Sequence, residues 1–433
     1  MFLFWIACTS DKATDTSVAD TAQTEDTAST ISDDPEQDTG GLGPIEILDG
    51  SLSGTIDIHL YTMNQDGDRE NITWDDAYAG VFPFGKIFVG AYYEDDEGNY
   101  QYVGYDIVEN PQPSGNPYSI DVELTQPEDI RVFGVLDYYI DDITGTDEPI
   151  GGYNRAISFE DGTQETNVNF SILSPLHEER PPCDNNDTIE VTGEATITET
   201  YTGGEIAVIL MEPGNVGPIH HSIAQPEILG GGAEASYLIE PCASSGYMVL
   251  KGIWDHNLNG MFDPMDKAGP YVSEPNQSGN PINVSYTNLS GHEIQIPLGE
   301  NSGLKLIPFV NLLGTVRPAT GTFDELAEGG TLHVAALKYR PNGETSVSTL
   351  EDNSYDMQTF TFDELSGKTE IEWKLTVPSE TIAYLWAYID REGNGVINEA
   401  QEPIASGGQD DNGKFPTGSS STSNINMILA VME

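Results

Sequence analysis

The organisation of this chain is clearest near its C-terminal end, in Ala383-Tyr-Leu-Trp-Ala-Tyr-Ile-Asp-Arg-Glu-Gly-Asn-Gly-Val-Ile-Asn-Glu-Ala-Gln-Glu-Pro403. It begins as an apolar, aromatic-rich run, which is typical of a buried strand. Oxygen-bearing side chains then follow at alternate positions, Asp390, Glu392 and Asn394, before Gly395 and Asn398. A hard cation binds about six to eight oxygens, and a tightly turned loop can direct alternate side chains toward it. The stretch therefore predicts a buried strand that leads into a calcium loop.

Two further copies of this strand-plus-loop unit lie upstream. One is Leu250-Lys-Gly-Ile-Trp-Asp-His-Asn-Leu-Asn-Gly-Met-Phe-Asp-Pro-Met-Asp266, and the other, less complete, begins at Val132-Phe-Gly-Val-Leu-Asp137. Other landmarks recur in the same order, namely a glycine-led strand at Gly85, Gly204 and Gly330 and then a proline at Pro127, Pro241 and Pro378. Landmarks repeated about 120 residues apart predict tandem domains rather than a solenoid.

The expected fold class is all-β. Short runs with period-two alternation, bounded by turn residues, predict strands along most of the chain. We expect three tandem antiparallel β-sandwich domains, immunoglobulin-like in architecture, with about seven strands each. Their expected boundaries are residues 44–174, 183–299 and 304–433, with linkers at 175–182 and 300–303. The first linker is charged and proline-rich, which is typical of a domain boundary.

The charge of the chain limits its partners. Its 433 residues include 72 Asp and Glu against 16 Lys and Arg, so the formal net charge is -56. Nucleic acid is excluded as a partner, because phosphates demand cationic contacts. The charge fits a soluble, self-repelling surface in a cation-rich medium.

The N-terminal segment, residues 1–8, is an apolar run that ends at Cys8. Ile6-Ala7-Cys8 resembles the end of a bacterial lipoprotein signal peptide, in which a small residue precedes the cysteine that is lipidated. Residues 9–43 are nearly all Thr, Ser, Asp, Ala, Glu and Gly, a composition that predicts a disordered acidic tether. The resemblance implies a lipid-anchored protein on the outer surface of a bacterial cell envelope, with the membrane as a partner. The alternative is an accidental apolar N-terminus on a cytosolic protein.

A strand that leads into an Asp-x-Asn-x-Asn-Gly loop, repeated in tandem, resembles the prealbumin-like B-type repeats of bacterial surface adhesins. The loop alone also resembles the calcium loops of dockerins and EF-hands, although a strand rather than a helix leads into it here. The adhesin resemblance implies prealbumin-like sandwiches that bind calcium and serve a structural or adhesive role without catalysis. A protein or a glycan would then be the ligand.

The resemblance assigns metal ligands residue by residue. Asp255, Asn257, Asn259, Asp263 and Asp266 fall on the side-chain positions of an EF-type loop, and Met261 supplies its backbone carbonyl. In the third domain the corresponding ligands are Asp390, Glu392, Asn394, Val396, Asn398 and Glu402. The first domain keeps Asp137, Asp141, Asp142 and Glu148 but has lost the Asn-Gly core, so it is expected to bind metal least. The alternative is that all three segments are acidic hairpin turns without metal, since Asp, Asn and Gly are ordinary turn residues.

The remaining cysteines are Cys183 and Cys242, both in the second domain. An even pair outside the cytosol predicts a disulfide, and two free buried thiols are the alternative.

No motif for catalysis is present in the sequence: it has no Gly-x-Ser-x-Gly elbow, no His-Glu-x-x-His and no phosphate loop. The pair His220-His221 is expected on a surface, since neighbours on a strand point to opposite faces. Asp75-Asp76 and Asp95-Asp96-Glu97 are expected to be solvated turns. The cluster Tyr92, Tyr93, Tyr100, Tyr102 and Tyr105 is either a set of cross-strand pairs or a platform for sugar rings. The expected function is that of a non-enzymatic surface lipoprotein. A glycan-binding module that supports a separate enzyme is the main alternative, and a hydrolase is a third.

Overall fold

The computed structural model describes residues 47–65, 67–96, 100–145, 148–177, 183, 187–198, 200–211, 220–229, 232–243, 246–271, 282–296, 309–327, 329–340, 345–346, 353–379, 381–391, 396–397, 402–408, 413–418 and 421–431. They belong to one compact unit, Glu46–Glu433. The predicted signal segment 1–8, the predicted tether 9–43 and the predicted linker 300–303 lie outside the described residues.

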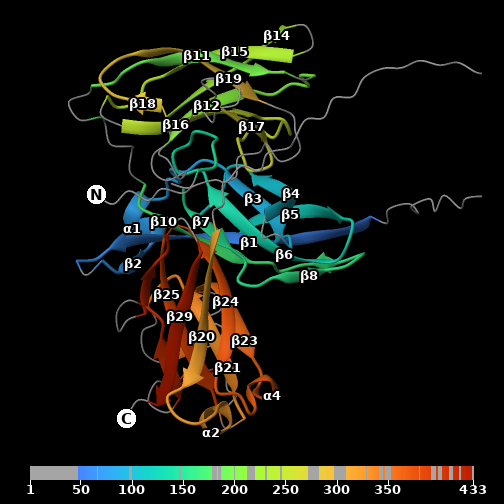
Figure 1. The fold of residues 1–433 in the computed structure, drawn as a ribbon, viewed down its shortest axis with the longest axis vertical. Coiled ribbons are helices and arrows are strands. Elements are labelled where there is room, and N and C mark those ends of the chain that lie inside the picture. The colour runs from blue at the N-terminus through green and yellow to red at the C-terminus, as the bar shows by residue number, and fades with distance from the viewer. Residues whose placement is uncertain are drawn as a thin grey trace, which may run out of the picture. The chain divides into compact units, whose positions relative to one another are not determined.

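Sandwich 1 comprises the first ten strands of the chain (Figure 1). The strands are β1 (Leu48–Met63), β2 (Arg69–Ile72), β3 (Ile87–Glu94), β4 (Tyr100–Val108), β5 (Asn116–Leu124), β6 (Glu128–Leu136), β7 (Ile150–Gly152), β8 (Ile157–Phe159), β9 (Gln164–Glu165) and β10 (Phe170–Pro175). Their hydrogen bonds follow the order β2-β1-β10-β7-β6-β3-β4, with β5 and β9 on β1 and β8 on β6.

Sandwich 2 consists of two separate sheets. Its strands are β11 (Val191–Ile197), β12 (Ile206–Met211), β13 (His220–Ala224), β14 (Glu227–Leu229), β15 (Gly232–Ile239), β16 (Gly246–Trp254), β17 (Lys267–Pro270), β18 (Ile282–Val284) and β19 (Leu289–Ile296). One sheet has the order β14-β15-β11-β19, and the other has the order β13-β12-β16-β17 with β18 on β16. Figure 1 shows β11 and β15 in one layer and β12 and β16 in the other.

Sandwich 3 contains the remaining strands. They are β20 (Phe309–Pro318), β21 (Thr331–Leu337), β22 (Thr345–Ser346), β23 (Ser354–Phe360), β24 (Ile371–Pro378), β25 (Ile382–Asp390), β26 (Val396–Ile397), β27 (Pro403–Ser406), β28 (Lys414–Pro416) and β29 (Thr422–Val431). The main path is β23-β21-β25-β27-β29-β20-β24, with β28 on β25, while β22 pairs with β26.

The three sandwiches share one pattern of strand pairing. The first strand pairs antiparallel with a middle strand, and the loop-leading strand pairs antiparallel with the glycine-led strand: β1–β5, β11–β15 and β20–β24, then β6–β3, β16–β12 and β25–β21. The prediction of an all-β chain of tandem sandwiches is confirmed. One pairing differs from the expected antiparallel scheme, because the first strand of each sandwich pairs in parallel with the last, as β1–β10, β11–β19 and β20–β29. The last strand returns beside the first in the same direction, and in sandwiches 1 and 3 it also pairs with a further strand, β10 with β7 and β29 with β27.

Each sandwich has a core of its own, built from inward-facing apolar side chains. Strand β5 shows the period clearly, since buried and exposed residues alternate along its whole length, with Ile120 and Val122 fully or almost fully buried. Each such apolar side chain contributes about 1.5–3 kcal/mol by leaving water.

The loop-leading strands bury their last apolar residues, Leu136, Trp254 and Ile389, which are 0% exposed. The aspartate that follows each of these residues therefore lies at the end of a fixed strand.

Helix contributes little to the fold. The described helices are α1 (Trp74–Tyr78), α2 (Phe323–Ala327) and α4 (Phe362–Leu365), each about one turn long. Helix α1 begins after Thr73, whose hydroxyl accepts a hydrogen bond from the Asp76 amide. Among the described residues, no helix is long and apolar enough to cross a membrane.

Candidate metal sites

The first acidic loop, residues 137–148, follows β6. The side chain of Asp137 is buried, and its two oxygens accept hydrogen bonds from the backbone amides of Asp141 (3.0 Å) and Asp142 (3.3 Å). Glu148 is also buried, and its Oε1 accepts from the Tyr138 amide at 3.1 Å. These bonds hold the loop in a tight turn with its carboxylates on the inside.

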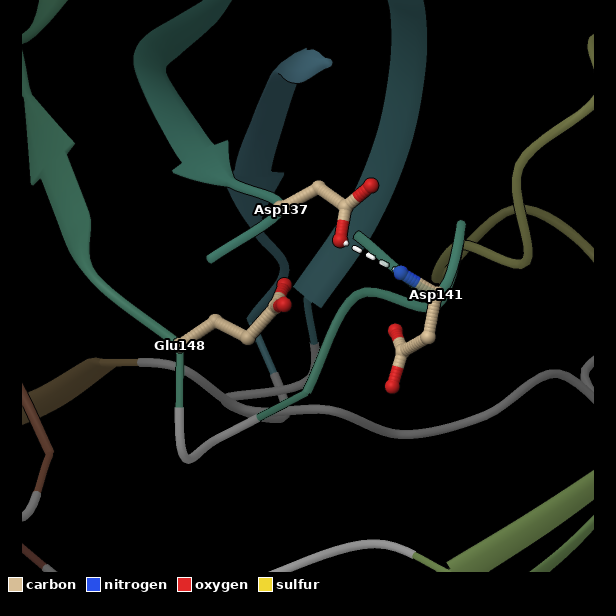
Figure 2. Close-up of side chains that lie close together, drawn as sticks. All are labelled: Asp137, Asp141 and Glu148. Atoms are coloured by element: carbon tan, nitrogen blue, oxygen red, sulfur yellow. Dashed lines mark hydrogen bonds between the residues drawn. The ribbon is translucent and has the colours of Figure 1, made fainter. Parts of the chain in front are cut away.

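Three carboxylates converge in this loop (Figure 2). One oxygen each from Asp137, Asp141 and Glu148 lies within 4.8 Å of the other two. An all-oxygen, anionic donor set suits a hard cation such as Ca²⁺, which takes oxygen ligands at about 2.3–2.6 Å. Burial, together with the charges of Asp141 and Asp142, raises the pKa of Asp137 to about 6. The sequence ranked this loop lowest because it lacks the Asn-Gly core, yet its acids at the first, fifth and twelfth positions are brought together.

The second acidic loop, residues 255–266, follows β16 and begins in the same way. The oxygens of Asp255 accept from the backbone amides of Asn259 (3.2 Å) and Gly260 (3.3 Å), which are four and five residues further on, as in the first loop. Asp266 closes the loop, because its Oδ1 accepts from the His256 amide at 3.0 Å. The predicted ligands Asp255 and Asp266 are thus held at the two ends of one turn.

Asp263 lies inside this second loop. Its Oδ2 accepts from the side-chain amides of Asn257 (3.3 Å) and Asn259 (2.7 Å), and its backbone amide donates to Asp266 Oδ2 at 3.1 Å. The two asparagines therefore present nitrogen to Asp263. Because an Asn side chain carries one oxygen and one NH2 group, both amides would have to turn to offer oxygen to a cation. The predicted carbonyl ligand belongs to Met261, whose side chain is fully buried.

The acids of the second loop are buried and form no ion pair with the described cations, although Lys86 donates to the carbonyl of Gly260 in the same loop at 2.9 Å. Asp263 and Asp266 are each 1% exposed and Asp255 is 6% exposed, and none of the three forms an ion pair with a described Lys or Arg. Burial raises the pKa of all three, and the charge of Asp263 raises that of Asp266 further. The loop therefore favours either a bound proton or a bound cation.

The third acidic loop begins at Asp390, the last residue of β25, which is 5% exposed. Glu402 is 3% exposed, and its Oε1 accepts from the Arg391 amide at 2.9 Å. Val396 lies in β26, which pairs with β22. The other predicted ligands of this loop, Glu392, Asn394 and Asn398, lie outside the described residues.

One hydrogen bond is common to all three loops. The amide of the residue after the leading aspartate donates to the last acid of the loop: Tyr138 to Glu148, His256 to Asp266 and Arg391 to Glu402. The sequence pattern did not reveal this bond, because it depends on how each chain turns. The three loops therefore share one hydrogen bond between their first turn and their last acid.

The cysteine pair and the aromatic cluster also have defined positions. Cys183 and Cys242 are joined in a disulfide with a Cα–Cα distance of 5.2 Å, whereas Cys8 lies outside the described residues. Tyr92 packs against Tyr100 and Tyr102 of the neighbouring strand, with ring centroids 5.1 and 6.1 Å apart. These rings form cross-strand pairs, which favours a structural role for the cluster over a sugar platform.

His220 and His221 are adjacent on β13 and partly buried. Nδ1 of His221 lies 3.6 Å from Asp141 Oδ2 in the first acidic loop. The sequence predicted both on a surface, whereas both are half-buried and His221 lies beside the first acidic loop.

Comparisons with known proteins identify no family: no protein-family model matches the sequence, and no curated protein matches it. Solved structures do match. A leucine-rich repeat protein from Bacteroides thetaiotaomicron shares 9% identity with a TM-score of 0.17, over 57% of this chain and only 27% of that protein. The tip fimbrial protein Mfa3 from Porphyromonas gingivalis shares 10% identity with a TM-score of 0.15, over 48% and 80% of the two chains. The major pilin subunit BcpA of Bacillus cereus shares 7% identity with a TM-score of 0.17, over 87% and 99%. Similarity at these TM-scores carries no argument about function, so the proposals below rest on the residues of this chain.

Proposed function

We propose that this chain is a non-enzymatic structural or adhesive protein of a bacterial cell surface, whose acidic loops bind calcium. The observation that carries the proposal is the second loop, where three buried aspartates have no described Lys or Arg as a counterion. Burying an ionised carboxylate without a partner is strongly unfavourable, so such a group takes up a proton or a cation. In an extracellular medium, calcium is the cation that suits an all-oxygen donor set.

The residues that would hold calcium follow from the loop geometry. In the second loop they are Asp255, Asp263 and Asp266, with Asn257 and Asn259 after their amides turn. In the first loop they are Asp137, Asp141 and Glu148, whose oxygens already converge. Asp390 and Glu402 have the corresponding positions in the third loop. A bound ion would offset the repulsion among these carboxylates and fix each loop-leading strand to the chain beyond the loop.

The anchor completes the proposal. Cys8, at the end of an apolar run and in front of an acidic tract, is the proposed lipidation site, and residues 9–43 are the proposed tether. A charged, polar tract of this length would hold folded domains away from a membrane.

A glycan-binding module is the second candidate, and one cavity favours it. This cavity of about 530 Å³ is lined by amide and hydroxyl side chains, among them Thr55, Asn154 and Asn169, beside Tyr153 and Arg155. Amides and hydroxyls of this kind hydrogen-bond sugar hydroxyls. A glycan array with the full chain tests it, and binding lost in Asn169→Ala would favour the module over a purely structural role.

Calcium binding is tested directly by calorimetric titration of the full chain, with Asp255→Ala as the variant. Asp121→Ala, which removes an exposed aspartate on β5, is the matched control. Wild type and control should bind with a dissociation constant of about 0.1–1 mM, as extracellular calcium modules do. Asp255→Ala should lose one site. An identical isotherm for all three proteins would reduce the second loop to an acidic turn.

A further inference from the structure

A second set of charged contacts lies outside the acidic loops, where sandwiches 1 and 3 meet. Sandwiches 1 and 3 contact one another through Arg69, Arg131, Lys338, Lys374 and Lys414, which are five of the 16 Lys and Arg residues. Both sandwiches are rich in Asp and Glu, so their surfaces repel each other in the absence of such cations.

Arg69 of β2 places its guanidinium among acceptors that all belong to sandwich 3. Nη1 donates to the hydroxyl of Tyr355 (2.9 Å) and to the carbonyls of Ile382 (2.9 Å) and Lys338 (3.3 Å), while Nη2 donates to Thr381 Oγ1 (2.6 Å). On its other side the guanidinium lies 4.9 Å from the ring centroid of Tyr61, within sandwich 1. Contacts to four acceptors, three of which share the two hydrogens of Nη1, fix the position of this side chain.

Arg131 of β6 forms an ion pair with Asp356 of β23 at 3.1 Å, and the Asp356 side chain is 2% exposed. The same carboxylate accepts from the backbone amides of Met357 (2.9 Å) and Thr376 (2.7 Å) inside sandwich 3. A carboxylate this deeply buried requires its cation, and here the cation comes from the other sandwich.

Lys338 of sandwich 3 makes the reciprocal contact. It is 2% exposed, and its Nζ donates to Ser171 Oγ at 2.8 Å and to the Ser171 carbonyl at 3.3 Å. Each sandwich therefore inserts a cation into the other.

The rim of the contact is polar as well. Lys374 pairs with Glu94 at 2.6 Å, and Lys414 lies 3.7 Å from Asp68 and donates to the carbonyl of Gly67. Apolar packing accompanies these bonds, because the ring of Phe309 at the start of β20 lies 5.8 Å from that of Tyr92 and 5.5 Å from that of Phe133.

We propose that sandwich 3 is the binding partner of sandwich 1 and that the two form one cooperative unit, although sandwich 2 separates them in the sequence. The cations of the contact neutralise two acidic surfaces and give the docking its specificity. The inference is independent of calcium and of the membrane anchor.

A double-mutant cycle in the full chain tests the central pair. Arg131→Met leaves Asp356 buried without its cation, and should lower the melting midpoint by roughly 5–15 °C. Asp356→Asn keeps a carbonyl acceptor for the backbone amides and should have a smaller effect. The double variant should melt no lower than Arg131→Met alone, because the same contact is lost only once. Additive losses would overturn the inference.

Hydrogen exchange in the same proteins shows which strands are destabilised when Arg131 is replaced. Arg131 belongs to sandwich 1, so its substitution should speed exchange in β21 and β23 of sandwich 3. Arg317→Ala, which removes an exposed cation on β20, should leave those strands unchanged. A change confined to sandwich 1 would overturn the inference.

A charge swap covers the case in which Arg131→Met fails to fold. Lys374→Glu and Glu94→Lys each place like charges at the rim, and each should speed exchange in β24 about twofold to fivefold. The combined swap should restore the wild-type rate. Failure of the swap to restore it would count against docking through this contact.

Discussion

Replacing Asp137 by asparagine should stabilise the calcium-free protein and at the same time abolish its response to calcium at the first loop. Asp137 is 1% exposed, and its pKa rises from 3.8 to about 6. A pKa raised this far corresponds to about 3 kcal/mol against the ionised form at neutral pH. Asparagine removes the charge but keeps an oxygen for the Asp141 amide. Losing the bond from the Asp142 amide costs about 0.5–1.5 kcal/mol, so the net gain in chelator is about 2 kcal/mol.

The raised pKa of Asp137 determines the direction in which stability changes with pH. A carboxyl whose pKa is higher in the folded state binds its proton more tightly there than in the unfolded chain. Its contribution to stability is therefore fully present below about pH 4 and is lost as the pH rises to about 6. In chelator, the first loop of wild type should therefore be more stable against opening at pH 5 than at pH 7.5. The Asp137→Asn variant should lack this difference.

Calcium should reverse the order of the two proteins. At about ten times the dissociation constant, a bound ion adds about 1.4 kcal/mol to the stability of wild type. Asp137→Asn removes a ligand and should lose most of that gain.

Hydrogen exchange of the Asp141 and Asp142 amides reports on the loop within the full chain, because both donate to Asp137. Asp121→Asn controls for loss of one acidic charge. A variant that is less stable than wild type in chelator, and that still gains protection with calcium, would refute the reasoning.

Three further outcomes are expected. Asp390→Ala should abolish the calcium response of sandwich 3 while leaving that of sandwich 2 intact, as measured by hydrogen exchange in β25 and β16; a joint loss would contradict separate sites. Reduction of the Cys183–Cys242 disulfide, which spans 59 residues, should destabilise sandwich 2 by roughly 2–5 kcal/mol in a denaturant titration, and two alkylatable thiols in the oxidised protein would disprove the bond. In a bacterial host, the chain should incorporate labelled palmitate and Cys8→Ser should leave the membrane fraction; equal partitioning of the two would exclude the anchor.

The sandwich architecture was accessible from the sequence because its signals are local. Period-two alternation and the repeated strand-plus-loop unit each occupy a few consecutive residues, and both predict strands. The parallel pairing of first and last strands was not accessible. β1 and β10 meet only after the whole sandwich has folded, so no local pattern records their direction.

The acidic loops were likewise only partly predictable from the sequence. Sequence matching predicted ligands in the second loop, since Asp, Asn and Gly recur there at fixed spacing. It ranked the first loop lowest, because it weighted the Asn-Gly core, whereas the convergence of carboxylates in the structure depends only on Asp137, Asp141 and Glu148. The bond from the Tyr138 amide to Glu148 brings the end of that loop back to its beginning, and only the folded chain shows it.

The two proposals share one physical cause, which is the scarcity of positive charge. With 72 acidic and 16 basic residues, most carboxylates of this chain cannot have a cationic side chain as partner. The structure places several of its few cations where two acidic sandwiches meet, as with Arg131 and Asp356. Asp255, Asp263 and Asp266 are left without a described counterion, although their burial disfavours the charged form. A chain that commits its cations to the contact between sandwiches therefore depends on the medium to neutralise its loops. Raising the salt concentration and removing calcium should thus act on different parts of the molecule. Salt should weaken the exposed pair Lys374–Glu94 at the rim of the contact, because the buried Arg131–Asp356 pair is screened much less, whereas removing calcium should act on the loops.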